Sequence, residues 1–89
     1  MKESGLTAAF AKVLNLFPEL SRFKIKLRFF ISKPGFPQGK VLREGTEYVV
    51  YLAINLIRDY IEAEFVIAHE LAHILINPKC IPGIKENTP

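Results

Sequence analysis

The sequence predicts an α+β domain in which a helix is followed by three strands, a second helix and an irregular tail. Three observations lead to this class. Apolar residues recur at helical spacing in residues 4–17 and 56–77, they alternate with basic residues in 24–31, and residues 40–53 have the pattern of a β-hairpin around a Glu44-Gly45 turn. This order predicts a small, mainly antiparallel sheet packed with helices.

Length and composition indicate one globular domain, residues 1–89. Apolar residues make up 49% of the chain and charged residues 24%, which is typical of a folded rather than a disordered protein. Cys80 is the only cysteine, so no internal disulfide can form. No apolar run reaches the length of a membrane span. We therefore expect a cytoplasmic protein without a transmembrane segment.

The N-terminal half is expected to contain the first helix and the first strand. Ser4 is a candidate N-cap for a helix over residues 4–17, and Pro18 ends that helix. Residues 24–31 then follow a period of two, which predicts a strand with one buried face and one solvated, basic face. The apolar positions are Ile25, Leu27, Phe29 and Ile31, and the basic positions are Lys24, Lys26 and Arg28.

The second half begins with the hairpin. Its second strand, within residues 46–53, is apolar on both faces, which predicts a strand covered on both sides. Asn55 is a candidate N-cap for a second helix over residues 56–77, which Pro78 ends. The remaining residues contain three prolines and a Pro-Gly turn and show no periodicity, so we expect an irregular tail.

The second helix contains the string HELAH at residues 69–73, which includes the only two histidines of the chain. Imidazoles at positions i and i+4 lie on one face of a helix, where both can direct a ring nitrogen at one ion about 2 Å away. The other residues between 65 and 76 are apolar in every direction, which predicts a buried helix. Burying His69, Glu70 and His73 without partners is unfavourable, and a divalent cation with its water supplies those partners. A pair of core histidines satisfied by other groups is the alternative.

The order of the motif suits hydrolysis at zinc. A catalytic Zn²⁺ takes three protein ligands and leaves one position for water. His69 and His73 are the predicted ligands of one zinc ion per chain. Glu70, directly after the first histidine, is the predicted general base that takes a proton from the attacking water and passes it to the leaving amine.

Residues 64–78, EFVIAHELAHILINP, resemble the active-site helix of the zincin metallopeptidases. The order of helix, sheet and active-site helix is similar to the upper subdomain of zincins, so the resemblance in layout covers most of the chain. Ile76 and Lys79 stand where metzincins have a glycine and a third histidine, which excludes that class. In size and order the chain is most similar to the minigluzincins, small members of the gluzincins, whose third ligand is a later glutamate.

The resemblance implies a zinc-dependent metallopeptidase that hydrolyses peptides or unfolded protein segments. It implies that one strand of the 40–53 hairpin pairs with the extended substrate through its free edge. The third ligand stays open. Glu86 is the first choice, and Cys80, Asn77, the C-terminal carboxylate and a residue of another chain are the alternatives. The tail is alternatively an inhibitory segment that lies across the cleft.

A non-catalytic module is the competing hypothesis. It retains the fold either as a zinc-binding regulator or as a basic surface that binds an acidic partner. Seven basic residues between Leu20 and Arg43 occur with no acidic residue among them, but few aromatic residues accompany them and no nucleic-acid-binding motif is present. We therefore do not expect nucleic-acid binding. Two further expectations concern Glu62, which is either solvated or paired with Arg58, and Cys80, which packs as a small buried residue.

Overall fold

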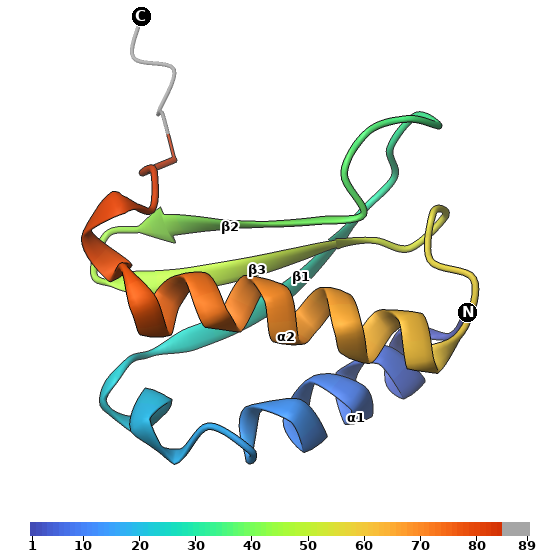
Figure 1. Cartoon of the computed structure of the whole chain (residues 1–89). Coiled ribbons are helices and arrows are strands. Elements are labelled where there is room, and N and C mark those ends of the chain that lie inside the picture. Colours follow the sequence, from blue (N-terminus) through green and yellow to red (C-terminus); the bar gives the residue numbers. More distant parts are fainter. Residues whose placement is uncertain (85–89) are drawn as a thin grey trace, which may run out of the picture.

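The structure of the chain is a computed structural model that describes residues 1–84. Two helices, two short 3-10 helices and three strands follow one another in the expected order (Figure 1). The elements are α1 (Glu3–Leu14), η1 (Pro18–Arg22), β1 (Ile25–Phe30), β2 (Gly39–Glu44), β3 (Glu47–Ala53), α2 (Tyr60–Ile76) and η2 (Pro78–Cys80). The α+β class and the succession of helix, sheet and helix are therefore confirmed. The chain after η2 extends past the end of β2.

The sheet is mixed, with strand order β1-β3-β2. The hairpin of β2 and β3 is antiparallel, whereas β1 pairs with β3 in parallel. The connection over residues 31–38 carries the chain past β3 to the far edge, and the side chain of Asn55 holds it there by bonding to both backbone groups of Ser32. The expected hairpin is confirmed, and half of the strand pairing is parallel rather than antiparallel. β3 is the central strand and is paired along both edges. Its fully buried residues are Val49, Val50, Leu52 and Ala53.

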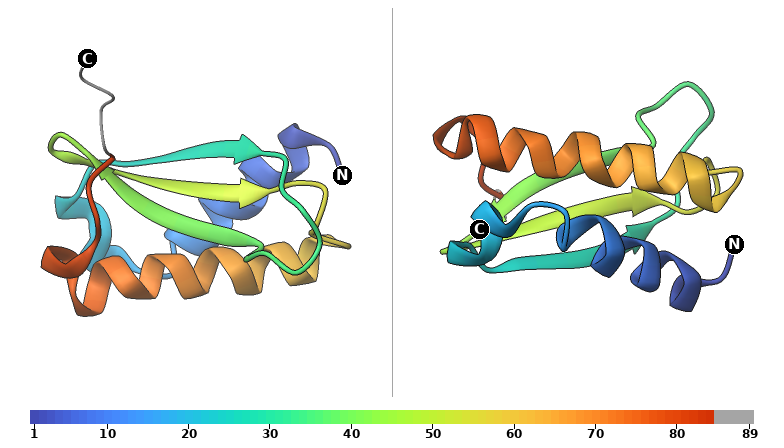
Figure 2. Two further views of the ribbon diagram at one scale, coloured as in Figure 1. Left: turned by 90° about the horizontal axis from the view of Figure 1, so that it is seen from above. Right: turned by 60° about the horizontal axis from the view of Figure 1, so that its bottom comes forward.

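Both helices cover the same face of the sheet, α2 against β2 and β3 and α1 beside it against β1 (Figure 2). The core lies between these two layers. Its largest fully buried side chains include one from α1, one from η1, one from β3 and three from α2, namely Leu6, Leu20, Leu52, Ile67, Leu71 and Ile74. The two-layer arrangement places the exposed edge of β2 alongside α2.

The helix boundaries differ from those expected. The first helix spans Glu3–Leu14 with Lys2 at its N-cap position, so Ser4 lies inside the first turn. Leu14 is followed by a turn, and Pro18 opens η1, a position where its missing N–H costs no hydrogen bond. For α2 the N-cap is Asp59, whose carboxylate accepts a hydrogen bond from the Glu62 backbone N–H at 2.8 Å. Asn55 lies before this cap and does not adjoin α2, and its side chain bonds to Ser32 instead.

The basic row of β1 lies on the open face of the sheet, as expected. Lys24 and Lys26 both pair with Glu47, at 3.2 and 2.7 Å, and Arg28 pairs with Glu44 at 3.4 Å. The sequence separates these acids from the basic row, but the sheet brings them together. The row is therefore a set of exposed ion pairs, which contribute little to stability and leave little excess positive charge for a partner.

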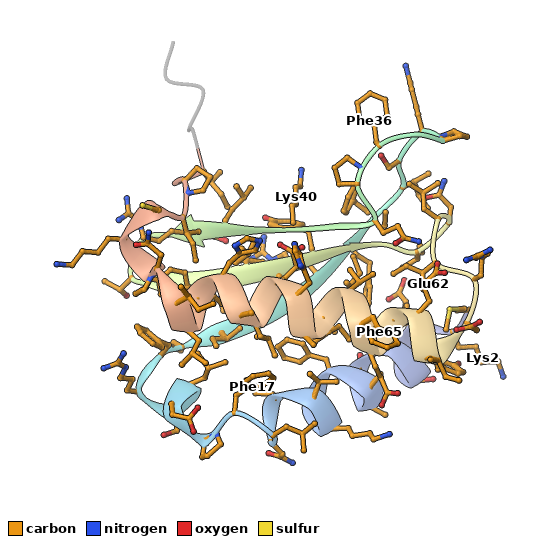
Figure 3. All side chains as sticks on the ribbon, viewed as in Figure 1. Lys2, Phe17, Phe36, Lys40, Glu62 and Phe65 are labelled. Atoms are coloured by element: carbon orange, nitrogen blue, oxygen red, sulfur yellow. The ribbon has the colours of Figure 1, made fainter. Side chains whose placement is uncertain are left out.

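The expectation that α2 is buried all round is wrong. Ile61, Phe65 and Ile76 are 68%, 73% and 80% exposed. The physical reason is that residues 1–84 form two layers, so among them α2 has neighbours on the sheet side and the α1 side but none opposite these. Phe65 projects from the outer surface of α2 in Figure 3. Within residues 1–84 no helix is long and apolar enough to cross a lipid bilayer.

Candidate metal centre

The two histidines of α2 face one another. Their Nε2 atoms are 3.1 Å apart, and the rings are perpendicular with centroids 4.7 Å apart. Two nitrogens bound to the same tetrahedral zinc, each about 2.05 Å from it, lie about 3.3 Å apart. An N–H···N hydrogen bond between the two rings has a similar length. The helix thus holds both ring nitrogens at the separation that a single zinc ion requires.

Both histidines are exposed, which corrects the expectation that they are buried. They belong to a row on the outer face of α2, spaced three or four residues apart, that consists of Ile61, Phe65, His69, His73 and Ile76. The apolar members of this row made the helix pattern resemble that of a buried helix. Since the imidazoles are open to solvent, neither needs a metal to offset a burial cost.

Glu70 is the exception, because its side chain points inward and the residue is only 7% exposed. Its burial raises the pKa of the carboxyl, and the neighbouring His69 and His73 offset part of that increase. No hydrogen bond to this carboxylate forms within residues 1–84. Its oxygens are not fully enclosed, since no buried side-chain oxygen without a hydrogen-bond partner occurs within the described residues. A partly enclosed carboxylate adjacent to two imidazoles is suited to exchanging a proton.

An open cleft of about 670 Å³ lies beside the histidines. One wall is α2 from His69 to Ile76 with Asn77 after it, the opposite wall is the start of β2, and the far end is formed by Cys80, Ile81 and Pro82. A second hollow of about 310 Å³ adjoins it on the other side and is lined by residues that include Pro37 and Phe65. Gly39, His69 and Glu70 line both. The candidate site is therefore at the middle of a continuous depression along α2.

β2 is the edge strand of the sheet on this side, so it is the hairpin strand with a free edge next to the site. β3 is excluded because it is paired on both sides. Lys40 points away from α2, whereas Val41 packs in the core (Figure 3). At Gly39 the strand lies close against the helix, and an added Cβ there would lie 3.6 Å from Cγ of Glu70. Gly39 thus brings the strand edge next to the candidate base.

The loop before β2 is fixed to the start of α2 through Glu62. The Gln38 side-chain amide donates to the Leu56 carbonyl at 3.1 Å and to the Glu62 carboxylate. Arg58 holds the other carboxylate oxygen at 2.9 Å, which confirms the expected Arg58–Glu62 pair. This bonding holds the pKa of Glu62 below its ordinary value, chiefly through Arg58. The network positions the residue that precedes Gly39 and therefore helps to hold the start of β2.

Comparison of the chain with protein-family models, curated proteins and solved structures finds no match. The interpretation of the site therefore depends on its own geometry.

The described residues supply two ligands rather than three. Within residues 1–84 no third His, Cys, Asp or Glu side chain joins His69 and His73 in a group able to hold a metal. Cys80 lines the cleft and is exposed, so the expectation that it packs as a buried residue is wrong. Glu86 and the C-terminal carboxylate lie outside the described residues. The spacing of the imidazole pair fits a zinc ion.

Two residues that line the cleft, Gly39 and Pro82, and the Arg43 residue that bonds to Pro82 were not among those expected to contribute. Gly39 ends a loop rich in proline and glycine, and that local pattern indicates a turn without indicating its contact with α2. Arg43 and Pro82 meet through their backbones, and no side-chain pattern could have revealed the contact.

Proposed function

We propose that the protein is a zinc-dependent metallopeptidase of the zincin type. The observation that carries the proposal is the arrangement at the middle of the depression, with two Nε2 atoms 3.1 Å apart beside the buried Glu70. His69 and His73 would hold the zinc ion. A bound zinc ion supplies Lewis-acid activation of the water and of the peptide carbonyl.

The roles of the protein's own groups follow from where they lie. The Glu70 carboxylate takes a proton from the attacking water and returns it to the amine nitrogen as the C–N bond breaks. The pKa of the Glu70 carboxyl is raised toward neutral pH, so its carboxylate is a stronger base than that of an exposed glutamate. The free edge of β2 would hold an extended peptide by backbone hydrogen bonds, so the proposed substrates are peptides and unfolded segments.

A zinc-binding module without turnover is the second candidate. The finding that favours it is the pair of ligands without a third among residues 1–84. If a partner chain supplied two further ligands, a metal held by the two imidazoles would have no open position for water. The same experiment separates the two candidates, because only the peptidase depends on Glu70.

The test is hydrolysis of a reduced, unfolded protein by the zinc-reconstituted chain, followed by mass spectrometry. We expect Glu70→Gln to retain zinc and to lower the rate on the order of 10²-fold or more, since it removes the proton acceptor. Glu64→Gln is the matched control on the same helix, because Glu64 pairs with Lys12 away from the cleft. Equal hydrolysis by wild type and Glu70→Gln, or no hydrolysis by either, would contradict the proposal.

A further inference from the structure

The chain after η2 occupies part of the edge of β2. The Arg43 backbone N–H donates to the Pro82 carbonyl at 2.9 Å, and the Ile84 N–H donates to the Arg43 carbonyl at 2.9 Å. Arg43 and Gly83 thereby form a parallel bridge. Figure 2 shows this segment, Pro82–Ile84, passing the C-terminal end of β2. At that point the edge has no remaining backbone groups for another strand.

Two further contacts hold the segment in place. Ile81, directly before it, is buried in the core. The Tyr48 hydroxyl donates to the Pro78 carbonyl at 3.3 Å, at the start of η2. The segment is therefore a built part of the domain, and its first residue, Pro82, forms the far end of the cleft together with Cys80 and Ile81.

The rest of the edge has no backbone partner among the described residues. In an antiparallel pair, successive residues direct their backbone groups alternately toward the partner strand and away from it. Gln38 accepts a hydrogen bond from Ala53, and Arg43 bonds outward, so Gly39 and Val41 direct their groups outward like Arg43. No residue between 1 and 84 pairs with the backbone of Gly39 or Val41 on that side. An extended peptide can therefore add to the sheet at these two residues.

The position of Glu70 relates this edge to the bond that is cleaved. Gly39 is the β2 residue beside Glu70, and both hollows meet there. A strand advances about 3.3 Å per residue, so Val41 lies about 7 Å and Arg43 about 13 Å along the edge from Gly39. The cleaved bond would lie beside Gly39, and the edge is filled at Arg43. Only Val41 remains between them to pair with the peptide, which leaves room for one or two peptide residues before the cleaved bond.

The direction of the peptide decides which of its ends is limited. Antiparallel addition is the more stable pairing per residue, and it places the amino end of the peptide toward Arg43. The carboxyl end then leaves past Gly39 along the second, open hollow beside Pro37 and Phe65. Cleavage of an internal bond in a long chain would require the part of the substrate before that bond to pass through the end of the cleft that is filled at Arg43.

We propose that Pro82–Ile84 closes the amino-terminal end of the substrate cleft, so that the substrates are peptides with a free amino terminus. This inference rests on the proposed peptidase function. Water adds across the first or second peptide bond, which releases a fragment of one or two residues with a new carboxylate and leaves the shortened peptide with a new amino terminus. The segment thus determines substrate class by setting how many residues precede the cleaved bond.

The test compares a linear dodecapeptide with the head-to-tail cyclic peptide of the same sequence. We expect the zinc-loaded chain to cut the linear peptide after its first or second residue and to leave the cyclic one intact. Ile84→Pro in the full chain removes the N–H that bonds to Arg43, and should gain cleavage of internal bonds and of the cyclic peptide. Ile84→Ala keeps that N–H and is the matched control, which should behave as wild type.

Amide hydrogen exchange of the zinc-free chain gives a readout independent of catalysis. Adding the linear peptide should slow exchange at Val41 and leave the already bonded Arg43 amide unchanged. Three results would overturn this inference and leave the peptidase function standing. They are internal cleavage by wild type at the rate of terminal cleavage, trimming of the peptide from its carboxyl end, and no slowing of exchange at Val41. Hydrolysis of neither peptide by any variant, with Val41 protected, overturns the peptidase function and leaves the closed edge standing.

Discussion

A methyl group added to the Cα of Gly39 would lie 2.6 Å from Cγ1 of Val66, closer than two carbon atoms can approach. It would also lie 3.2 Å from the carbonyl oxygen of Tyr51. Only hydrogen fits between β2 and α2 at this position. The absence of a side chain at Gly39 therefore sets the separation between the edge strand and the helix that carries Glu70.

Replacing Gly39 with alanine should force β2 and α2 apart. We expect Gly39→Ala to lower the free energy of unfolding by about 1–3 kcal/mol, as overpacking does elsewhere, and to weaken peptide hydrolysis. The double variant Gly39→Ala/Val66→Ala should recover part of the stability because it removes the clashing methyl. Gly83→Ala is the control, since its added Cβ meets no atom closer than 3.5 Å. Urea unfolding measures all four proteins, and an unchanged midpoint for Gly39→Ala would refute the close contact.

The ion pair at the start of α2 gives a prediction about pH. Bonding to Arg58 holds the pKa of Glu62 below its ordinary value of 4.5, so the carboxylate stabilises the fold above that value. This contribution is lost as pH falls through the lowered pKa. Glu62→Gln should therefore be less stable than wild type at neutral pH, with the difference shrinking in acid. Arg58→Gln should show the same loss, and thermal unfolding at a series of pH values measures it. A difference that is constant with pH would contradict this account.

The third ligand can be located by measuring zinc affinity. Because Cys80 does not form a candidate metal-binding group with the two histidines, we expect Cys80→Ser to bind zinc with the affinity of wild type. Glu86→Ala should bind more weakly, as expected for the loss of one ligand. Competition with a chromogenic chelator gives both values. Equal affinity of wild type and Glu86→Ala would exclude Glu86, and a dependence of affinity on protein concentration would indicate a ligand from a second chain.

Local patterns predicted the elements well, because each pattern reports on its own segment. The alternation in β1, the apolar strand β3 and the turn at Gly45, which adopts φ +63, all follow from neighbouring residues. The pair of histidines on one helix face belongs to the same class of inference, because helix geometry alone brings them together.

Contacts between distant segments were not predictable in this way. The parallel pairing of β1 with β3 depends on the path of residues 31–38, and the sequence does not state which edge that path reaches. The exposure of α2 follows from the absence of a third layer, which an apolar helix pattern does not reveal. The bridge between Arg43 and Gly83 uses backbone groups that every residue has. These long-range features position the site and close the cleft.

The central claim is that His69 and His73 bind zinc, and elemental analysis of the reconstituted, dialysed chain tests it most directly. We expect one zinc ion per chain in wild type and in Glu70→Gln, and none in His69→Ala or His73→Ala. Zinc should also raise the unfolding temperature of the first two proteins only, because binding stabilises the folded state. Wild-type protein without zinc, or histidine variants that retain it, would contradict the account.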